Sequence, residues 1–327
     1  MRAIQAREPG DAGVLDLVEL PDPVPGPGEV VARSAAAGIN FIDTYRRSGV
    51  YAIPFPHVPG DEGAGVVTAV GEGVTGLAVG ERIAWVDAPS AYAELVRVPA
   101  SRALPVPDGV GLDVAAALPL QGMTAHYLVA STRPVGEGEW ALVHAGAGGV
   151  GLLLTQLATL RGARVVTTVS TEEKAALSRA AGAAAVIRYD ELDDLTTQLP
   201  PLVKEAAGGP VDVVYDGVGR ATFDASLATL RRRGMLVLFG GSSGQVPPFD
   251  LQRLNAGGSL FTTRPKLGDY IVDATELRWR WDELMAAVVA GRLDVRIGAR
   301  FPLADAASAH RALEGRATTG KVILEIG

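Results

Sequence analysis

The stretch WALVHAGAGGVGLLLTQLATL, residues 140–160, decides the fold of this chain. The apolar run before the glycines, WALV, predicts a strand, and the apolar run after them, LLLTQLATL, predicts a helix. Gly146, Gly148 and Gly151 therefore lie between a predicted strand and a predicted helix. Gly146 allows the tight turn, Gly148 lets backbone N–H groups approach a pyrophosphate at the positive helix end, and Gly151 lets helix and strand pack closely. The context favours a dinucleotide-binding loop over a purely structural glycine-rich turn.

Apolar strands alternate with amphipathic helices downstream of this loop. The predicted strands are Trp140–His144, Arg164–Val169, Ala185–Ile187, Asp212–Asp216, Met235–Phe239 and Ser259–Thr263. Such an alternation predicts a doubly wound parallel α/β sheet of the Rossmann type.

The flanking regions have a different texture. Before residue 111, short β-branched runs such as EVVARSAAAGI (29–39) and ERIAWV (81–86) are bounded by turn residues, which predicts an irregular barrel or sandwich. After Arg264, a helical pattern over Glu276–Ala290 and a second one over 302–316 precede the strand-like end KVILEIG. We expect this tail to return to the first part of the chain.

Composition excludes several classes of protein. The chain has 327 residues, 48% of them hydrophobic, and a net charge of −7, which suits two globular domains. It has no cysteine, so disulfides, thiolate nucleophiles, iron–sulfur centres and cysteine-ligated zinc are excluded. No basic run exceeds Arg231–Arg233, which argues against nucleic-acid binding. The start MRAIQAREPG lacks the apolar region of a signal peptide, and no stretch is apolar enough to span a bilayer, so we expect a cytoplasmic protein without membrane contact.

The end of the second predicted strand indicates which dinucleotide binds. NAD-binding folds usually place an acid there for the ribose 2′-hydroxyl, but this strand ends in Ser170 and Thr171, with Lys174 shortly after. Hydroxyls and an ammonium suit a 2′-phosphate, so NADP(H) is favoured. Glu172 and Glu173 keep NAD open as the alternative, although both also fit the first turn of a helix, where its dipole favours acids.

Several motifs together resemble quinone oxidoreductases of the zeta-crystallin type, in the zinc-free branch of the medium-chain dehydrogenase/reductases. They are NFIDTYRRSGVY (40–51), VTAVGEGVTGLAVGERI (67–83), HAGAGGVG (144–151), VVYDGVGRATFDASLATLRRRG (213–234), Thr263-Arg-Pro and GRATTGKVILEI (315–326). The resemblance covers essentially the whole chain. It implies a mostly-β GroES-like catalytic domain over residues 1–123, a Rossmann NADP(H)-binding domain over 124–265, and a C-terminal return over 266–327. It also implies an active site in the cleft between the domains and a homodimer.

The resemblance further implies an enzyme without metal. Zinc-dependent relatives have a Gly-His-Glu element where this chain has Gly60-Asp61-Glu62, and their cysteine ligand is missing. The four histidines are scattered, with no i, i+4 pair, so each is interpreted as a packing or surface residue: His57, His126, His144 and His310.

Site residues follow from the resemblance position by position. Asn40, Tyr45 and Thr124 would lie near the nicotinamide, and Gly146, Ala147, Gly148, Gly149 and Val150 along the pyrophosphate. Ser170, Lys174 and Tyr189 would surround the 2′-phosphate. Phe239, Gly240, Gly241, Ser242 and Thr263 would flank the nicotinamide ribose, with Arg316 as a further cofactor contact. Tyr45, Tyr51 and Arg264 would face the quinone. Gln121 departs from the lysine of some bacterial relatives, and Tyr45 and Tyr51 could alternatively serve core packing.

The implied reaction is reduction of a quinone by NADPH through alignment and hydrogen bonding, since no Lewis acid is expected. Two alternatives stay open. Related zinc-free reductases reduce activated C=C bonds of 2-alkenals or enoyl thioesters, and a non-enzymatic, NADPH-dependent RNA-binding or crystallin-like role is also known among zeta-crystallins.

Overall fold

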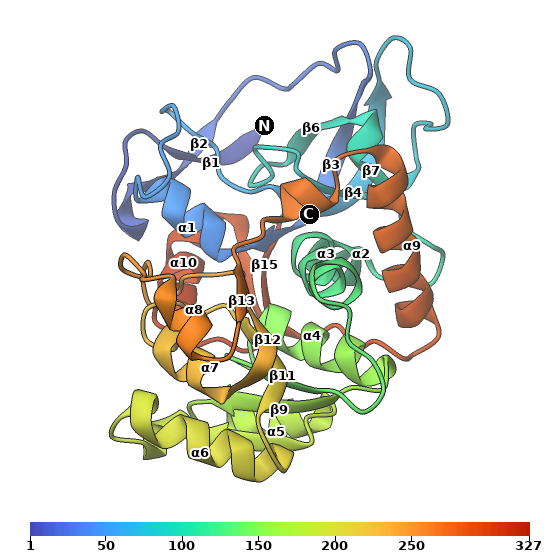
Figure 1. The fold of residues 1–327 in the computed structure, drawn as a ribbon. Helices are drawn as coiled ribbons and strands as arrows, with labels where there is room; N and C mark the ends of the chain where they lie inside the picture. The colour runs from blue at the N-terminus through green and yellow to red at the C-terminus, as the bar shows by residue number, and fades with distance from the viewer. The chain divides into compact units, whose positions relative to one another are not determined.

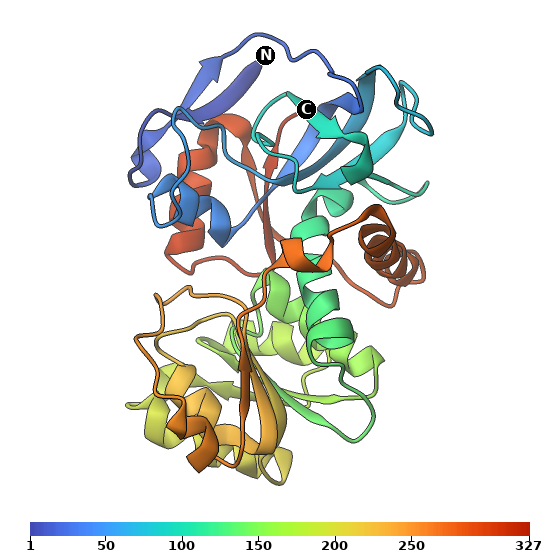
Figure 2. The same cartoon turned by 45° about the horizontal axis from the view of Figure 1, so that its top comes forward.

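The computed structural model describes residues 1–327, which form two compact units. The first unit comprises Met1–Met123 and Ile271–Gly327, and the second comprises Thr124–Tyr270. The ribbon of the second unit runs from green to orange in Figures 1 and 2. The sequence predicts changes of domain after residues 123 and 265, and the contact-defined units change after 123 and 270. The role assigned to each domain stays a prediction.

The second unit is built on a six-stranded parallel sheet in the order β10-β9-β8-β11-β12-β13. Its strands are β8 (Trp140–Val143), β9 (Arg164–Val169), β10 (Ala185–Arg188), β11 (Val211–Asp216), β12 (Leu230–Leu238) and β13 (Phe261–Thr263). Its helices are α4 (Gly149–Leu160), α5 (Glu172–Ala180), α6 (Leu195–Ala207), α7 (Phe223–Thr229) and α8 (Gln252–Ala256). The predicted doubly wound α/β class is confirmed.

The strand boundaries differ from prediction in detail. Strand β12 begins at Leu230 rather than Met235, and β13 begins at Phe261 rather than Ser259. Ser259 has φ of 58°, a left-handed conformation that an extended strand does not contain. Side chains of the strands contribute to a buried core that includes Leu142, Val166, Val214 and Leu236. Near-continuous apolar strands of this kind are typical of a parallel sheet covered on both faces.

The first unit contains a seven-stranded sheet. Six strands follow the order β14-β15-β3-β4-β5-β7, and β6 pairs with β3. These strands are β3 (Glu29–Ile39), β4 (Glu62–Val70), β5 (Arg82–Val86), β6 (Leu95–Pro99), β7 (Ala103–Pro105), β14 (Ile297–Pro302) and β15 (Lys321–Glu325), and β1 (Arg2–Ala6) pairs separately with β2 (Leu15–Glu19). The C-terminal strand β15 runs antiparallel to β3, with Val322 opposite Ile39. The end of the chain thus completes the sheet begun by its first third.

Helices of the first unit are α1 (Phe41–Arg47), α2 (Leu112–Ala117), α9 (Ala274–Val289) and α10 (Ala306–Glu314). Helix α3 (Pro119–Tyr127) begins at a proline, which is favoured in the first turn of a helix, and a π-helical turn over Leu128–Thr132 follows it. None of the helices combines the length and the apolar character needed to span a membrane.

Candidate active site

The glycine loop connects β8 to α4. Its left-handed residue is Ala145, with φ of 53°, rather than a glycine. Packing leaves no room for a side chain at Gly146, because a Cβ there would lie 2.5 Å from Cβ of Thr167 in β9. A Cβ on Gly151 would overlap the carbonyl oxygen of Ala145. The close packing predicted at Gly151 is present. Gly146 lies in the predicted tight turn, which the Gly148 N–H closes by donating to the Ala145 carbonyl at 2.9 Å, and it also makes room for the neighbouring strand.

The first turn of α4 is where the sequence predicts the pyrophosphate to bind. Gly148 is the N-cap, and the first turn of any helix presents backbone N–H groups without intrahelical acceptors. A Cβ on Gly148 would meet one neighbouring atom, at 3.2 Å, so the loop surface is open above it. Gly149 and Val150 therefore present a positive helix end that fits a pyrophosphate.

The residues predicted to recognise the 2′-phosphate gather at the ends of β9 and β10. Lys174 Nζ donates a hydrogen bond to Ser170 Oγ at 3.2 Å. Thr171 caps helix α5 by accepting a hydrogen bond from the Lys174 backbone N–H at 3.2 Å. Arg188 is paired with Val169, so Tyr189 follows Arg188 at the same sheet edge at which Ser170 follows Val169.

Glu172, the acid that keeps NAD open as an alternative, is held by arginines. Arg179 Nη1 donates a hydrogen bond to its carboxylate at 2.7 Å, and Arg188 Nη1 lies 4.0 Å away. The hydrogen bond from Arg179 lowers the pKa of Glu172. The carboxylate is thus bound by side chains of α5 and β10 and makes no hydrogen bond at Ser170.

The segment after β12 packs against the segment after β11. Phe239 N–H donates to the Asp216 carbonyl at 2.9 Å, and Ser242 N–H donates to the Gly217 carbonyl at 3.3 Å. A Cβ on Gly240 would overlap the Gly217 oxygen, so the two loops approach as closely as glycines allow. This contact fixes the backbone over Phe239–Ser242, the segment predicted to flank the nicotinamide ribose.

A buried polar cluster holds the loop after β11 in place. His144 contacts Thr168 Oγ1 at 2.9 Å and Ser226 Oγ at 3.0 Å, and Ser226 donates to Asp216 at 2.9 Å. Asp216 also accepts the Val218 N–H at 2.8 Å. Burial lowers the pKa of His144. The serine lies between the histidine and the aspartate, and all three are buried, so the cluster orients a loop and does not form a nucleophile with its base.

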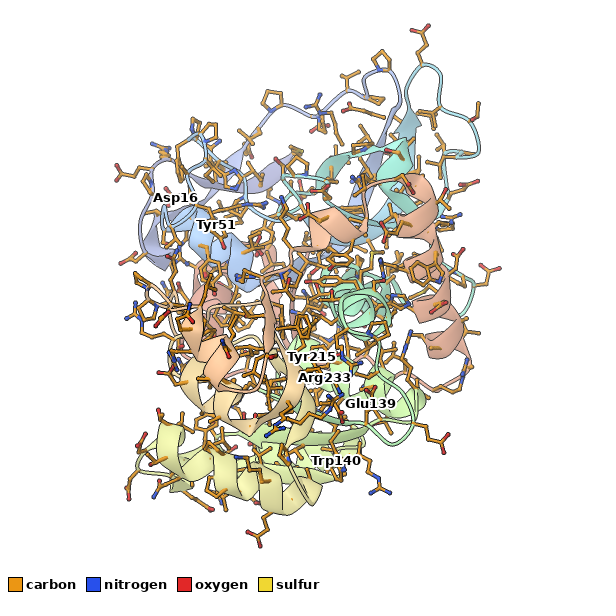
Figure 3. All side chains as sticks on the ribbon, viewed as in Figure 1. Asp16, Tyr51, Glu139, Trp140, Tyr215 and Arg233 are labelled. Carbon is orange, nitrogen blue, oxygen red and sulfur yellow. The ribbon has the colours of Figure 1, made fainter.

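In the first unit, the predicted quinone-facing tyrosines lie in and just after helix α1: Tyr45 is in the helix and Tyr51 follows its end. The rings of Tyr45 and Tyr51 meet edge to face, with centroids 5.8 Å apart, and Tyr51 N–H donates to the Tyr45 carbonyl at 3.1 Å. Phe41 lies one helical turn before Tyr45, with ring centroids 6.2 Å apart. Tyr51 is 41% exposed and lies beside α1 (Figure 3). The tyrosines form a ring pair with an exposed member, which differs from the core packing that the sequence left open for Tyr51.

Asn40 precedes α1 and belongs to a buried polar group. Its Nδ2 donates to Glu62 Oε1 at 2.6 Å, and its Oδ1 accepts from Lys321 Nζ at 2.8 Å and from Gln121 Nε2 at 3.1 Å. Lys321 and Glu62 also form an ion pair, and both are buried. A predicted site residue is thus held on three sides by side chains of its own unit.

A second buried chain of hydrogen bonds begins at the N-terminal end of α1. Asp43 Oδ2 accepts from the Asn40 N–H at 2.8 Å and from Tyr92 Oη at 2.9 Å. Tyr92 Oη lies 3.2 Å from His310 Nε2, and Arg47 Nη1 lies 2.9 Å from His310 Nδ1. Arginine can only donate, so Nδ1 accepts and the proton of His310 resides on Nε2. Burial, with Arg47 adding to it, lowers the pKa of His310 to about 3, which keeps the ring neutral.

Asp43 is an acid with an unusual environment. Burial raises its pKa from the ordinary 3.8 to about 7, and the charge of Asp61 adds to the increase, while Asn40, Tyr92 and Lys321 oppose it. Its Oδ1 has no hydrogen-bond partner, so the ionised carboxylate is only partly compensated.

We expect Asp43→Asn to remove a pH dependence of stability. The folded pKa lies above the unfolded one, so the stabilisation is full below pH 3.8 and is lost as the pH rises through about 7. Relative to the Asn variant, wild type should lose up to about 1 kcal/mol per pH unit in this window. Urea unfolding between pH 4.5 and 7.5 measures the difference, with the exposed cap variant Asp11→Asn as control. A constant difference between wild type and Asp43→Asn across the window would contradict the prediction.

The position that corresponds to a zinc ligand in zinc-dependent relatives is Asp61. Its carboxylate forms an ion pair with Arg46, as Glu62 does with Lys321. The structure has no group of three or more His, Cys, Asp or Glu side chains that could hold a metal ion. Both carboxylates of the Gly60-Asp61-Glu62 element are therefore compensated by cations of the chain itself.

The predicted site residues fall into two sets. The first unit carries Asn40, Tyr45, Tyr51 and Arg316, and the second unit carries all the others, from Thr124 to Arg264. Within the units, the structure brings together Tyr45 with Tyr51 and Ser170 with Lys174. Sequence reasoning did not single out Glu62 or Lys321, although the charged residue that opens the apolar run KVILEI was a signal for the latter.

Comparisons with known proteins agree with this architecture. The alcohol dehydrogenase GroES-like domain matches residues 26–135, and the zinc-binding dehydrogenase domain matches residues 149–275. A quinone oxidoreductase of Pseudomonas aeruginosa is 41% identical over 325 residues, 99% of each chain. A mycobacterial protein solved in complex with NADPH is 51% identical, with a TM-score of 0.96 over 99% of this chain and 100% of that one. A 2-haloacrylate reductase of Burkholderia sp. is 42% identical over 312 residues, 92% of this chain and 91% of the relative.

The family model for GroES-like domains covers strands β3 to β7 of the first unit, and the second model covers most of the parallel-sheet unit. Identity above 40% extends over nearly the whole length. The resemblance drawn from the motifs is thereby confirmed. The chain belongs to the quinone oxidoreductases of the medium-chain dehydrogenase/reductase superfamily.

Proposed function

We propose that the chain transfers reducing equivalents from NADPH to a quinone without a metal ion. The observation that carries the proposal is 41% identity to a quinone oxidoreductase over nearly the full length. It is combined with a Rossmann unit in which hydroxyls and the ammonium of Lys174 follow the end of β9. Ser170 and Lys174 fit a 2′-phosphate, and the open first turn of α4 fits a pyrophosphate. Bound NADPH would supply the reducing equivalents at its nicotinamide ring.

The residues of the chain bind and orient in this proposal. Gly149 and Val150 hold the pyrophosphate by backbone N–H groups, and Phe239–Ser242 with Thr263 flank the nicotinamide ribose. Tyr45 and Tyr51 place the quinone ring, and Arg264 stabilises negative charge on its oxygens. A flat acceptor that becomes aromatic on reduction needs chiefly alignment, and its proton can come from water.

The charges of the site support the proposal that no metal ion is needed. Zinc would have to displace Arg46 from Asp61 or Lys321 from Glu62, and the latter pair is buried. We expect purified protein to contain no stoichiometric zinc and to keep its quinone turnover in EDTA. Metal analysis of the purified protein tests the first point, and NADPH oxidation followed at 340 nm with ortho- and para-quinones in EDTA tests the second. Loss of turnover in EDTA that zinc restores would contradict the proposal.

Reduction of activated C=C bonds is the second candidate, because the 2-haloacrylate reductase is 42% identical to this chain, against 41% for the quinone oxidoreductase, although over 92% rather than 99% of this chain. The same assay with 2-haloacrylates and 2-alkenals as acceptors distinguishes the two. Turnover of these acceptors with a higher kcat/KM than any quinone would favour the second candidate.

We further propose that the chain forms a homodimer. Strand β13 is the last strand of the parallel sheet, and the side chain of Phe261 in it is 53% exposed. An unpaired edge with an exposed aromatic side chain is suited to pairing with a second chain. Light scattering during size exclusion should give twice the mass of 33.8 kDa, whereas a single-chain mass would refute the dimer.

A further inference from the structure

The neighbouring side chains fix which way the amide of Asn40 is turned, because one of them can only donate and another only accepts hydrogen bonds. Lys321 has only hydrogen-bond donors, and it contacts Asn40 Oδ1 at 2.8 Å. Glu62 accepts from Asn40 Nδ2 at 2.6 Å and from the Leu120 N–H at 2.6 Å, as well as from Lys321, so it acts purely as an acceptor. The oxygen of the amide must face Lys321 and the nitrogen must face Glu62.

Strand register brings these groups together. Asn40 follows β3, Lys321 opens β15 and Glu62 opens β4, and β3 lies between the other two strands. Ile39 pairs with Val322, which places Asn40 next to Lys321. Gly38 makes room for the carboxylate of Glu62, because a Cβ at this position would overlap Glu62 Oε1.

Burial of this ion pair needs a reason other than stability. Glu62 and Lys321 are 0% and 2% exposed. Removing two charges from water costs about as much as their attraction returns, and a buried pair is often no more stabilising than apolar side chains of the same size. Buried charges can instead specify one arrangement of their neighbours, which fits the contacts of Asn40.

We infer that Lys321 and Glu62 are positioning residues that fix Asn40 so that it offers a single N–H donor to the nicotinamide end of the cofactor. Both lone pairs of Oδ1 are used, by Lys321 and by Gln121 at 3.1 Å. One N–H of Nδ2 donates to Glu62. The second N–H is then the polar group of the amide that can still donate to a ligand. The partner of Asn40 is then an acceptor oxygen. The inference rests on the proposed function and on the placement of Asn40 near the nicotinamide, which the family resemblance implies.

The test is a double-mutant cycle on NADPH affinity, measured by the fluorescence of the bound nicotinamide without quinone. Asn40→Ala should weaken NADPH binding by about tenfold, the value of one hydrogen bond. Glu62→Gln with Lys321→Met replaces the ion pair by neutral side chains of similar size and should cost about as much. If the pair acts through Asn40, the triple variant binds NADPH as Asn40→Ala does.

A matched control is the Arg280–Glu276 pair, which also has a buried cation. Arg280→Met with Glu276→Gln should leave the NADPH affinity unchanged. A second cycle avoids charge burial altogether: Gln121→Leu removes one donor to Asn40 and should weaken binding about threefold in wild type but not in Asn40→Ala. Lys321→Arg keeps a donor-only cation and should retain the affinity.

Additive losses in both cycles would overturn the inference, as would wild-type affinity in Asn40→Ala. Absence of quinone turnover in wild type would refute the proposed reaction but would leave these binding measurements valid. The two failures are thus distinguishable.

Discussion

Ser170→Asp combined with Lys174→Ala is expected to reverse the preference from NADPH to NADH, shifting the NADPH/NADH ratio of kcat/KM by about a hundredfold, from about 10 to about 0.1. Wild type should favour NADPH at least about tenfold, or about 1.4 kcal/mol, the worth of one contact to the 2′-phosphate. Lys174→Ala removes the ammonium that lies 3.2 Å from Ser170 Oγ. Ser170→Asp adds a carboxylate that repels the phosphate and can accept a hydrogen bond from the 2′-hydroxyl of NADH.

Steady-state kinetics with both cofactors would also show where the effect arises. The 2′-phosphate is remote from the reacting carbon, so its contacts persist unchanged in the transition state and Lys174→Ala should act mainly through KM for NADPH. Lys204→Ala removes an exposed lysine from α6 of the same unit and serves as control.

Two outcomes would contradict the placement of the phosphate. Equal use of both cofactors by wild type would mean that Glu172 or Glu173 reaches the ribose, despite the bonds of Glu172 to Arg179. A preference that survives both substitutions would place the phosphate site elsewhere, with Arg316 as the next candidate.

The parts of the site that the sequence predicts are those set by local geometry. The glycine loop lies between a strand and a helix that are adjacent in sequence, so the order of apolar runs was sufficient to find it. Ser170 and Lys174 are four residues apart across a helix cap, and Tyr45 and Tyr51 lie six apart around the end of α1. Such short separations place side chains together through local backbone conformation.

The unpredicted part depends on pairing between distant strands. Glu62 and Lys321 are 259 residues apart, and only the register of β15 on β3 and of β3 on β4 brings both to Asn40. A shift of one residue in either pairing would turn these side chains to the opposite face, and a single sequence does not encode that register visibly. Gly146 lies in the predicted tight turn, but its packing against Thr167 was not predicted, because it is a constraint across strands.

Arg264→Ala is expected to lower kcat/KM for the quinone by roughly ten- to a hundredfold, while the affinity for NADPH changes less. Arg264 directly follows β13, and Nη1 donates to the adjacent Pro265 carbonyl at 3.2 Å, so its charge is not committed to a carboxylate. A charge-assisted hydrogen bond made in the transition state is worth about 1.5 to 3 kcal/mol, which corresponds to this loss in rate. Initial rates over a range of quinone concentrations at saturating NADPH give the value.

The control for charge alone is Lys266→Ala, which removes a cation two residues away whose side chain is 75% exposed. Tyr45→Ala and Tyr51→Ala complete the set, because the tyrosines are proposed to place the ring and Arg264 to stabilise its oxygens. If stabilisation of charge is the role of Arg264, Arg264→Ala should lower kcat along with kcat/KM, since the interaction strengthens as negative charge develops. A loss confined to KM would instead indicate uniform binding of the quinone, and an unchanged kcat/KM in all three variants would remove these residues from the active site.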